Sequence, residues 1–377
     1  MAHGRPSPRV LTGEQARRIA VRAQLLAEPR PTDLLDVVRH LTVVQVDLTA
    51  AVAPSADLVC WSRVGGAFHP DDLDDLLDAH EVIEVDGMLR PAEDLALFRA
   101  ETAQWPGAEP LTEWQVRLQE WVEDNDGCRL DILDVLRSGG PTAVRHLPDT
   151  CVRPWRSSGW NNNRNVTMLV SLMERRGEVA VSHREGRERM WDLAERVHPD
   201  DDRVVPLDEA LEERARRRLA SLGLARARVA EVPGETYAVG PVGEEVAVEG
   251  VRGTWRADPD LLDRVDEPFE GRTVLLSPLD RLVFDRRRLA ELFGWEYQLE
   301  MYKPVARRRW GYWALPVLDG DRFVGKLDCT ADVERGVLRV DALHRDVTFD
   351  PGLEQRVDRE VEELARWLDL EVAGPAR

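Results

Sequence analysis

Basic and amide side chains gather in the middle third of the chain. Asn163 and Arg164 stand where a helix is expected to begin, and a later stretch carries three arginines around a glycine, namely Arg184, Arg187 and Arg189. Guanidinium groups suit phosphate oxygens, and amides suit base edges. These types and spacings favour a surface that binds nucleic acid. A helix pair and hairpin used only for protein contacts is the alternative.

The sequence around these groups predicts the element order of a winged helix. Residues 130–148 predict an amphipathic helix, a Gly-Gly-Pro break and a second short helix. A third helix is expected from about 163 to 176, followed by a hairpin that pairs 179–182 with 190–193. Residues 183–189 would form the tip of the wing. The first helix is expected to bury Leu130, Ile132, Leu133, Val135 and Leu136.

The overall charge argues against binding nucleic acid over the whole surface. The 377 residues include 51 Lys and Arg against 70 Asp and Glu, a net charge of −19. Three segments nevertheless run net positive: 153–189, 214–228 and 272–309. Residues 71–86 and the end of the chain are acidic. A basic channel inside an acidic shell fits this pattern, and so do ordinary solvated helix faces.

Cysteine usage and hydropathy exclude several classes of protein. The four cysteines are scattered without the spacing of a zinc site or a disulfide framework, so we expect reduced thiols and no metal site. The sequence contains no apolar leader before a cleavage site and no apolar run of about 18 residues. We therefore expect a soluble, cytoplasmic protein without a membrane partner.

Helix and strand patterns predict an α+β fold made of tandem winged-helix domains and a C-terminal antiparallel β-rich domain. The N-terminal part is expected to contain helices at 12–26, 31–41 and 70–79, an extended VVQVDLTA stretch, a strand pair at 82–89 and a helix that opens with Pro91. The predicted domains are a winged-helix-like domain at 9–125, a central winged helix at 126–200, a third winged-helix-like unit at 201–270 and a β-meander with a terminal helix at 271–377.

The last two domains have clear local signals. A basic helix is expected at 207–222, and short strands follow between 225 and 255. Beyond Thr273 the pattern is strand, loop and helix, then a meander with turns at Asp319-Gly320 and Arg335-Gly336. An amphipathic helix is expected at 352–370.

With its predicted helices and strands in this order, the chain resembles the winged-helix DNA glycosylases of the YcaQ/AlkZ family, which excise alkylated and crosslinked bases. The likeness covers most of the chain, and the third of the blocks that carry it is the most specific. The blocks are VVQVDLTAAVAPSADLVCWSRVG, RNVTMLVSLMERRGEVAVSHREGRERMWDLAERVHP and LLSPLDRLVFDRRRLAELFGWEYQLEMYKPVARRRWGYWALPVLDGDRFVGKLD. The resemblance implies tandem winged helices around a basic channel for duplex DNA, with no metal or nucleotide cofactor.

The family's active-site signature is Gln, an apolar residue, then Gln or Asp, and Gln45-Val46-Asp47 matches it. The resemblance implies that Asp47 stabilises an oxocarbenium-like sugar and acts as general base, while Gln45 orients water or the sugar-phosphate. The i, i+2 spacing puts both side chains on one strand face, with Val44 and Val46 toward the core. Alone, such a tripeptide is typical of any polar strand face.

One stretch departs from the family pattern. The predicted strand pair EVIEVDGMLRP lacks the His that many relatives carry there, and Asp86 and Arg90 occupy the neighbourhood. Substrate pocket, specificity or activity could therefore differ from those of the characterised members.

A second basic block, KPVARRRWGYW, combines cations with aromatic rings. Lys303, Arg307, Arg308 and Arg309 are expected to contact phosphates. We expect a strand here whose rings, Trp310 and either Tyr312 or Trp313, belong to the core rather than to a base-stacking surface. For Asp280, Asp285 and the arginines at 286–288, an internal ion-pair network is the alternative to DNA contacts.

The resulting hypothesis is a monofunctional DNA glycosylase that hydrolyses the N-glycosidic bond of N7-alkylated, bulky or crosslinked purines in duplex DNA. It is expected to act as a monomer at the nucleoid. The alternative is a non-catalytic winged-helix protein that sequesters lesions or regulates transcription. An operator reader normally needs a dimer with two-fold half-sites, and the sequence shows no heptad repeat for one.

Overall fold

The computed structural model describes residues 8–49, 51–157, 159, 162–198, 203–230 and 234–374. The fold is α+β, as predicted. The chain forms two compact units, one of residues 1–73 and 215–377 and the other of residues 74–214. These units cut across the four predicted domains, whose winged-helix character stays a prediction. Within the described residues, no helix is long and apolar enough to cross a membrane.

The first unit begins with helices whose caps are visible in the sequence. Helix α1 (Gly13–Ala23) starts at Thr12, which forms a reciprocal capping box with Gln15, as its predicted cap suggested. Helix α2 (Leu34–Leu41) starts later than predicted, because the Asp33 side chain accepts the Asp36 N–H and caps the helix there.

Helix α3 (Ser55–Val64) was not predicted from the sequence. Eight of its side chains are buried, including Ser55 at its start and Arg63 near its end. A helix buried on nearly all sides has no polar face, so its sequence lacks the 3.6-residue alternation that reveals an amphipathic helix.

A four-stranded sheet joins the two ends of the first unit. Its order is β1-β9-β10-β8, from strands β1 (Arg9–Leu11), β8 (Leu224–Ala225), β9 (Glu244–Val248) and β10 (Thr254–Ala257). Strand β1 is parallel to β9, whereas the other pairs are antiparallel. The predicted basic helix is present as α10 (Leu207–Leu222), and a short helix, α11 (Pro259–Asp263), follows the sheet.

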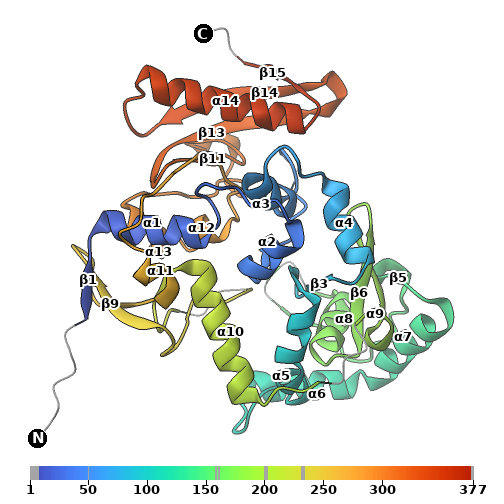
Figure 1. The fold of residues 1–377 in the computed structure, drawn as a ribbon. Coiled ribbons are helices and arrows are strands. Elements are labelled where there is room, and N and C mark those ends of the chain that lie inside the picture. Colours follow the sequence, from blue (N-terminus) through green and yellow to red (C-terminus); the bar gives the residue numbers. More distant parts are fainter. Residues whose placement is uncertain are drawn as a thin grey trace, which may run out of the picture. The chain divides into compact units, whose positions relative to one another are not determined.

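The C-terminal meander is confirmed. A five-stranded sheet has the order β11-β12-β13-β14-β15, from β11 (Thr273–Leu275), β12 (Leu315–Asp319), β13 (Arg322–Asp332), β14 (Val337–Arg345) and β15 (Glu371–Ala373). Gly320 and Gly336 adopt positive φ at the two predicted turns. Helix α14 (Pro351–Trp367) lies along this sheet (Figure 1). The strand β15, which pairs parallel with β14, was not predicted.

One hydrophobic core spans both ends of the chain in this unit. Ile19 and Leu26 of the N-terminal part share a cluster with Trp255, Leu289 and Trp295 of the C-terminal part. Helices α12 (Arg281–Phe284) and α13 (Arg286–Phe293) contribute to it. The predicted N-terminal domain is therefore split, since its first helix is packed into the C-terminal half.

The second unit contains a hairpin, a set of helices and a second hairpin. The first part comprises α4 (Pro70–Asp78), which begins in the first unit's residues, β3 (Val82–Val85), β4 (Met88–Pro91), the 3-10 helix η1 (Ala92–Leu97), α5 (Arg99–Ala103) and α6 (Glu113–Asp124). Pro91 ends strand β4 and precedes a 3-10 helix, so the prediction that it opens an α-helix is wrong.

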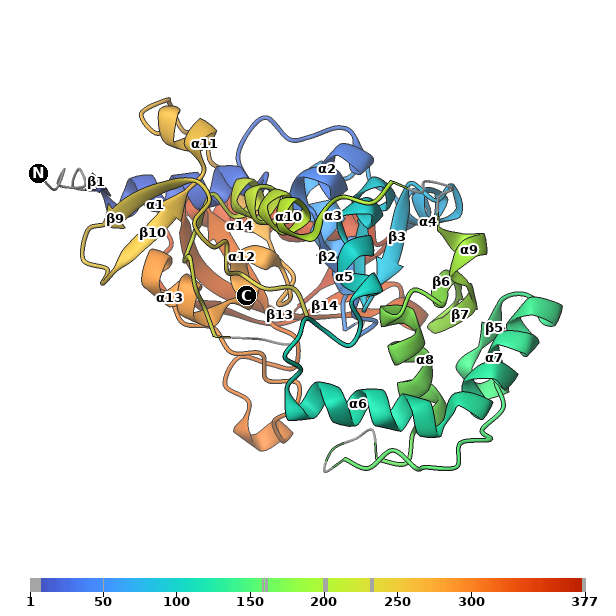
Figure 2. The same cartoon turned by 90° about the horizontal axis from the view of Figure 1, so that it is seen from below.

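The central segment has the order of elements that was predicted for a winged helix. It comprises α7 (Asp126–Gly139), β5 (Thr142–Ala143), the 3-10 helix η2 (Val144–His146), α8 (Asn165–Arg175), β6 (Val179–Glu185), β7 (Glu188–Leu193) and α9 (Ala194–Val197). The sheet order is β5-β7-β6. Figure 2 shows α7 and α8 grouped with this hairpin.

Two details of this segment correct the prediction. The buried stripe of α7 is Cys128, Ile132 and Leu136, whereas Leu130 is 49% exposed, because the inward face follows the i, i+4 spacing from Cys128. The hairpin strands also pair as far as Glu185 and Glu188, so the tip is only two residues long.

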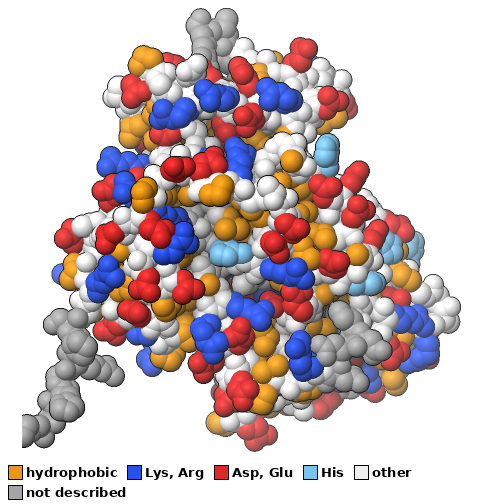
Figure 3. All heavy atoms as spheres, in the orientation of Figure 1, with side chains coloured by type: hydrophobic (Ala, Val, Ile, Leu, Met, Phe, Trp, Pro, Cys, Tyr) orange, Lys and Arg blue, Asp and Glu red, His pale blue; other side chains and the backbone are white. Residues whose placement is uncertain are grey.

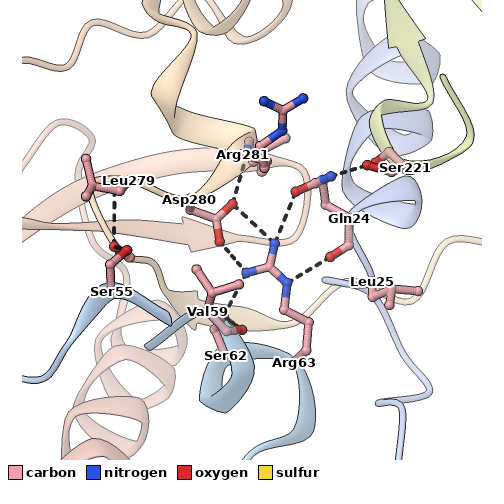
Figure 4. Close-up of polar contacts among 12 residues, drawn as sticks. Gln24, Leu25, Ser55, Val59, Ser62, Arg63, Ser221, Leu279, Asp280 and Arg281 are labelled. Carbon is pink, nitrogen blue, oxygen red and sulfur yellow. Dashed lines mark hydrogen bonds and ion pairs between the residues drawn. The ribbon is translucent and has the colours of Figure 1, made fainter. Parts of the chain in front are cut away.

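A buried ion pair joins Arg63 to Asp280 in the first unit (Figure 4). Both side chains are fully buried, and Arg63 meets both carboxylate oxygens, with Nη2 3.2 Å from Oδ1. Arg63 Nε also donates to the Gln24 carbonyl at 3.1 Å, and Nη1 donates to Ser62 Oγ at 2.8 Å. Gln24 in turn donates to the Ser221 carbonyl at 2.6 Å.

This network differs from the predicted one. Asp280 pairs with Arg63 instead of the arginines at 286–288, and Asp285 caps α13 by accepting the N–H groups of Arg287 and Arg288. The Arg288 side chain is buried and donates to the carbonyls of Leu222 and Leu224. Proximity in the sequence did not identify the partner of Asp280, because Arg63 and Asp280 are 217 positions apart.

We predict that Asp280→Asn lowers the free energy of unfolding by about 3–5 kcal/mol, because it leaves the Arg63 charge buried without a counter-ion. The double variant Arg63→Met/Asp280→Asn should be more stable than the single variant, since it removes the uncompensated charge. Urea unfolding measures both. Arg345→Ala, which breaks the exposed pair with Glu354, is the control and should cost less than about 1 kcal/mol. A double variant less stable than Asp280→Asn would contradict the argument.

Candidate functional site

The Gln45 and Asp47 pair lies where the chain leaves a very short strand. Strand β2 comprises only Val44–Gln45, and Val43 and Val44 are buried. Gln45, Val46 and Asp47 are each half-buried. Val44 therefore faces the core as predicted, but Val46 is only partly buried, because the strand has ended and strict alternation no longer applies.

Asp47 is held by both its backbone and its side chain. Its carbonyl accepts the Ser55 N–H at 3.0 Å, and its Oδ1 accepts the Thr49 N–H at 2.8 Å in a local turn. In the described part of the chain, neither Asp47 Oδ2 nor the Gln45 side-chain amide has a hydrogen-bond partner. One carboxylate oxygen is therefore fixed and the other remains available for a ligand.

The segment after Asp47 is anchored through α3. Ser55 Oγ and Ser277 Oγ lie 2.9 Å apart in a buried hydrogen bond, and Arg63 at the other end of α3 pairs with Asp280. Both ends of the helix are therefore fastened to residues 277–280, within the block that carries the family resemblance. The Ala331 N–H of β13 also donates to the Ala51 carbonyl at 2.8 Å. These contacts determine where the Asp47 carboxylate points.

Two predicted DNA-binding arginines are engaged with a buried carboxylate in the second unit. Arg184 donates to both carboxylate oxygens of Glu84, from Nε at 2.9 Å and from Nη2 at 2.8 Å, and Arg189 Nε lies 2.6 Å from Glu84 Oε1. Glu84 is 3% exposed. Sequence reasoning missed it, although a Glu inside an otherwise apolar strand is a signal for a buried ion pair. The cluster fastens hairpin β6–β7 to hairpin β3–β4.

The tip of the first hairpin is also fastened. Asp86 and Gly87 both adopt positive φ, as a two-residue hairpin turn requires. The Asp86 N–H donates to Glu174 Oε1 at 3.1 Å, and its carboxylate lies 3.2 Å from Arg175 Nη2. Burial raises the pKa of Glu174 to about 7, against the lowering effect of the Asp86 hydrogen bond. Asp86 therefore ties the hairpin to α8, in the neighbourhood where relatives carry a His.

The remaining predicted residues of the second unit lie at exposed positions. Arg187 is exposed in the wing turn, and its carbonyl accepts a hydrogen bond from Arg184 at 3.4 Å. Arg164 is exposed at the N-cap position of α8 and makes no side-chain capping bond. Asn163 has a left-handed backbone, and its Oδ1 accepts a hydrogen bond from Arg156 at 3.0 Å. Their contacts with DNA stay predictions.

The second basic block is a loop and not the strand that was expected. It contains the 3-10 helix η3 (Val305–Arg307), with Arg307 and Arg309 exposed. Lys303 lies 2.8 Å from a carboxylate oxygen of Glu300, and Arg308 donates to the Lys303 carbonyl at 3.0 Å. Trp313 is fully buried, in agreement with a core role, whereas Tyr312 is 39% exposed.

Three possible metal ligands come together in the second unit, although their spacing predicted no site. The donor atoms of Cys128, Asp149 and Cys151 lie within 4.8 Å of one another. Burial raises the pKa of the Cys151 thiol, and its neighbour Cys128 raises it further, so the thiol is protonated at neutral pH. Asp149 also accepts hydrogen bonds from the Asn165 amide. Among the described residues, the group offers three donors, one fewer than a structural zinc site uses.

The exposed charges are intermingled on the face shown in Figure 3, where basic and acidic side chains alternate. This face therefore carries no broad basic patch. The predicted basic channel stays a prediction.

Comparison with known proteins identifies the family. A model of the AlkZ-like DNA glycosylases matches residues 38–367. The solved structure of Streptomyces sahachiroi DNA glycosylase AlkZ superimposes with a TM-score of 0.64, covering 97% of this chain and 100% of that chain at 17% sequence identity. At that identity the structural likeness shows a common fold, while the family model covers most of the sequence. The chain belongs to the AlkZ-like DNA glycosylase family.

Proposed function

We propose that the protein is a monofunctional DNA glycosylase for N7-alkylated purines, including bulky and crosslinked lesions. The observation that carries the proposal is the Asp47 carboxylate, which holds the Thr49 N–H with Oδ1 and has Oδ2 available for a ligand. Family membership supports the reaction type. Duplex DNA that contains such lesions is the proposed substrate.

The chemistry suits a carboxylate. Alkylation at N7 gives the purine a positive charge, so its bond to C1′ breaks readily and the electron pair leaves with the base. The sugar then resembles an oxocarbenium ion, which the negative charge of Asp47 stabilises. Water adds to C1′ and gives its proton to Asp47, a general-base role worth roughly 10²–10⁴ in rate. Because water and not an amine attacks C1′, the DNA strand is left uncut.

Gln45 has a supporting role in this proposal. Its side-chain amide can both donate and accept hydrogen bonds, which suits the orientation of a water molecule or of the sugar-phosphate. Exposed arginines such as Arg187 and Arg307 would contact the DNA backbone. Such contacts hold the duplex in register without selecting a sequence.

A non-catalytic, lesion-binding protein is the second candidate. It is favoured by the first hairpin, where Asp86 is tied to α8 and no His is present. Incubation with duplex DNA treated with a methylating agent or a nitrogen mustard separates the two candidates. The glycosylase releases free N7-alkylguanine and leaves abasic sites, whereas the binding protein retards the DNA and releases nothing.

We predict that Asp47→Asn reduces the single-turnover rate of base release by at least roughly 100-fold, because it removes the charge and the base but keeps the shape. Affinity for the lesion duplex should change little, since the effect belongs to the transition state. Gln45→Ala should lose less activity. Full activity of Asp47→Asn would show that Asp47 is not the catalytic base.

We predict that Arg187→Ala and Arg184→Ala have different effects. Arg187→Ala should weaken binding to all duplexes equally and reduce the salt slope by about 0.9 per lost phosphate contact. Arg184→Ala should lower the free energy of unfolding by about 1–3 kcal/mol, because buried Glu84 loses its two-bond partner. Titrations on three unrelated duplexes at two salt concentrations, with urea unfolding, measure both. A sequence preference that disappears in Arg187→Ala would favour a regulator.

A further inference from the structure

We propose that Tyr302 and Val305 form an apolar wedge that enters a groove of duplex DNA and unstacks neighbouring base pairs. The proposal rests on the DNA-binding function proposed above and adds the residues that distort the duplex. The wedge belongs to the segment 300–312, which Figure 2 shows in orange as a loop projecting from its unit.

Exposure distinguishes these two side chains. Tyr302 is 84% exposed and Val305 is 75% exposed, and they stand three residues apart around the start of η3. Single exposed apolar side chains are common on protein surfaces, whereas an aromatic and a β-branched residue together on one projecting turn are suited to a specific contact. Apolar side chains of this kind are used by groove-binding proteins to separate base steps.

The segment is braced by one buried carboxylate. Glu300 is 3% exposed and accepts the N–H groups of Arg309 at 2.6 Å and Trp310 at 2.7 Å, as well as a hydrogen bond from Lys303 Nζ at 2.8 Å. Burial alone would raise the pKa of Glu300, but these hydrogen bonds lower it below its ordinary value. The carboxylate therefore stays ionised and closes the loop, so the wedge is held in place before DNA arrives.

A stack of aromatic rings connects the same loop to strand β13. Phe323 of β13 stacks on Trp295 at 4.4 Å, Trp295 on Tyr297 at 5.7 Å, and Tyr297 on Trp310 at 6.3 Å between ring centroids. Lys326, which is 2% exposed, lies over Trp295 and Trp310 and pairs with Asp346. Trp310, which is only partly buried, thus belongs to the support, and the ring offered to a ligand is that of Tyr302.

The end of the loop also approaches the sheet closely, at Gly311. Gly311 has a φ of 121°, and a Cβ atom there would collide with the Asp328 carboxylate of β13. A glycine is required for this approach. This approach fastens the end of the loop to β13, while Tyr302 and Val305 remain exposed.

Charge indicates that the partner is DNA. Residues 300–312 contain four cations and one carboxylate, a net charge of +3 in a chain whose net charge is −19. The one carboxylate, Glu300, is buried, while Arg307 and Arg309 are exposed beside the wedge. Unstacking a base step costs a few kcal/mol, and cations next to the wedge offset this cost by binding the flanking phosphates. An unstacked step also eases extrusion of the damaged nucleotide.

The test uses lesion duplexes that contain 2-aminopurine, whose fluorescence rises when it is unstacked. Wild-type protein should raise the signal on binding. Tyr302→Ala/Val305→Ser should lose most of that rise and bind roughly 5- to 100-fold more weakly, the effect expected from loss of an aromatic stacking contact. Its salt slope should be unchanged, because the arginines remain. Tyr302→Phe should keep the rise, since the ring and not the hydroxyl acts as the wedge.

Val333→Ser is the matched control. Val333 is 76% exposed and also begins a 3-10 helix, η4 (Val333–Arg335), but it is flanked by Asp332 and Glu334. It should behave as wild type. An undiminished fluorescence rise in Tyr302→Ala/Val305→Ser would overturn the wedge and leave the glycosylase proposal intact. Failure of the wild-type protein to bind any duplex would overturn both proposals.

A second measurement does not depend on the double variant. Photocrosslinking of wild-type protein to a lesion duplex that carries 4-thiothymidine beside the lesion, followed by peptide mass spectrometry, should place the crosslink at Tyr302. Crosslinks confined to other peptides would overturn the wedge.

Discussion

The buried pair of Arg63 and Asp280 is the contact on which the arrangement of the first unit depends. A buried charge without its partner costs several kcal/mol, so α3 is stable in one orientation, with Arg63 toward the segment at 277–280. The hydrogen bond between Ser55 and Ser277 fastens the other end of the helix. Because the Ser55 N–H also holds the Asp47 carbonyl, a buried ion pair and two hydrogen bonds determine where the proposed catalytic carboxylate lies.

The same principle governs the second unit and the proposed wedge. Glu84 holds two arginines of the wing, and Glu300 holds both ends of the basic loop, and each of these carboxylates is only 3% exposed. Basic side chains in this acidic protein therefore differ in their surroundings. Some stabilise hairpins and loops through buried carboxylates, while exposed ones such as Arg164, Arg187 and Arg307 lie at the surface, where a phosphate could reach them.

Short-range signals predicted most elements well. The Thr12 cap, the helix α10, the turns at Gly320 and Gly336 and the terminal helix were all visible in the sequence, because each depends on residues within about four positions. Predictions failed where the packing of the core determines whether a helix forms or which of its faces is buried. Helix α3 has no polar face and was missed. In α7 the face that packs against the core begins at Cys128, so Leu130 is exposed.

The sequence by itself determined the α+β class, the order of elements in the central segment, the family and the position of the Gln45-Val46-Asp47 motif. Only the tertiary structure decided which carboxylate each arginine meets: Asp280 for Arg63, and Glu84 for Arg184 and Arg189. The physical reason is that an ion pair depends on distance in space, and these partners lie 100 to 217 positions apart in the chain. Charge patterns along the chain contain no information about such pairs, so arginines that support the fold and arginines available to DNA look alike in the sequence.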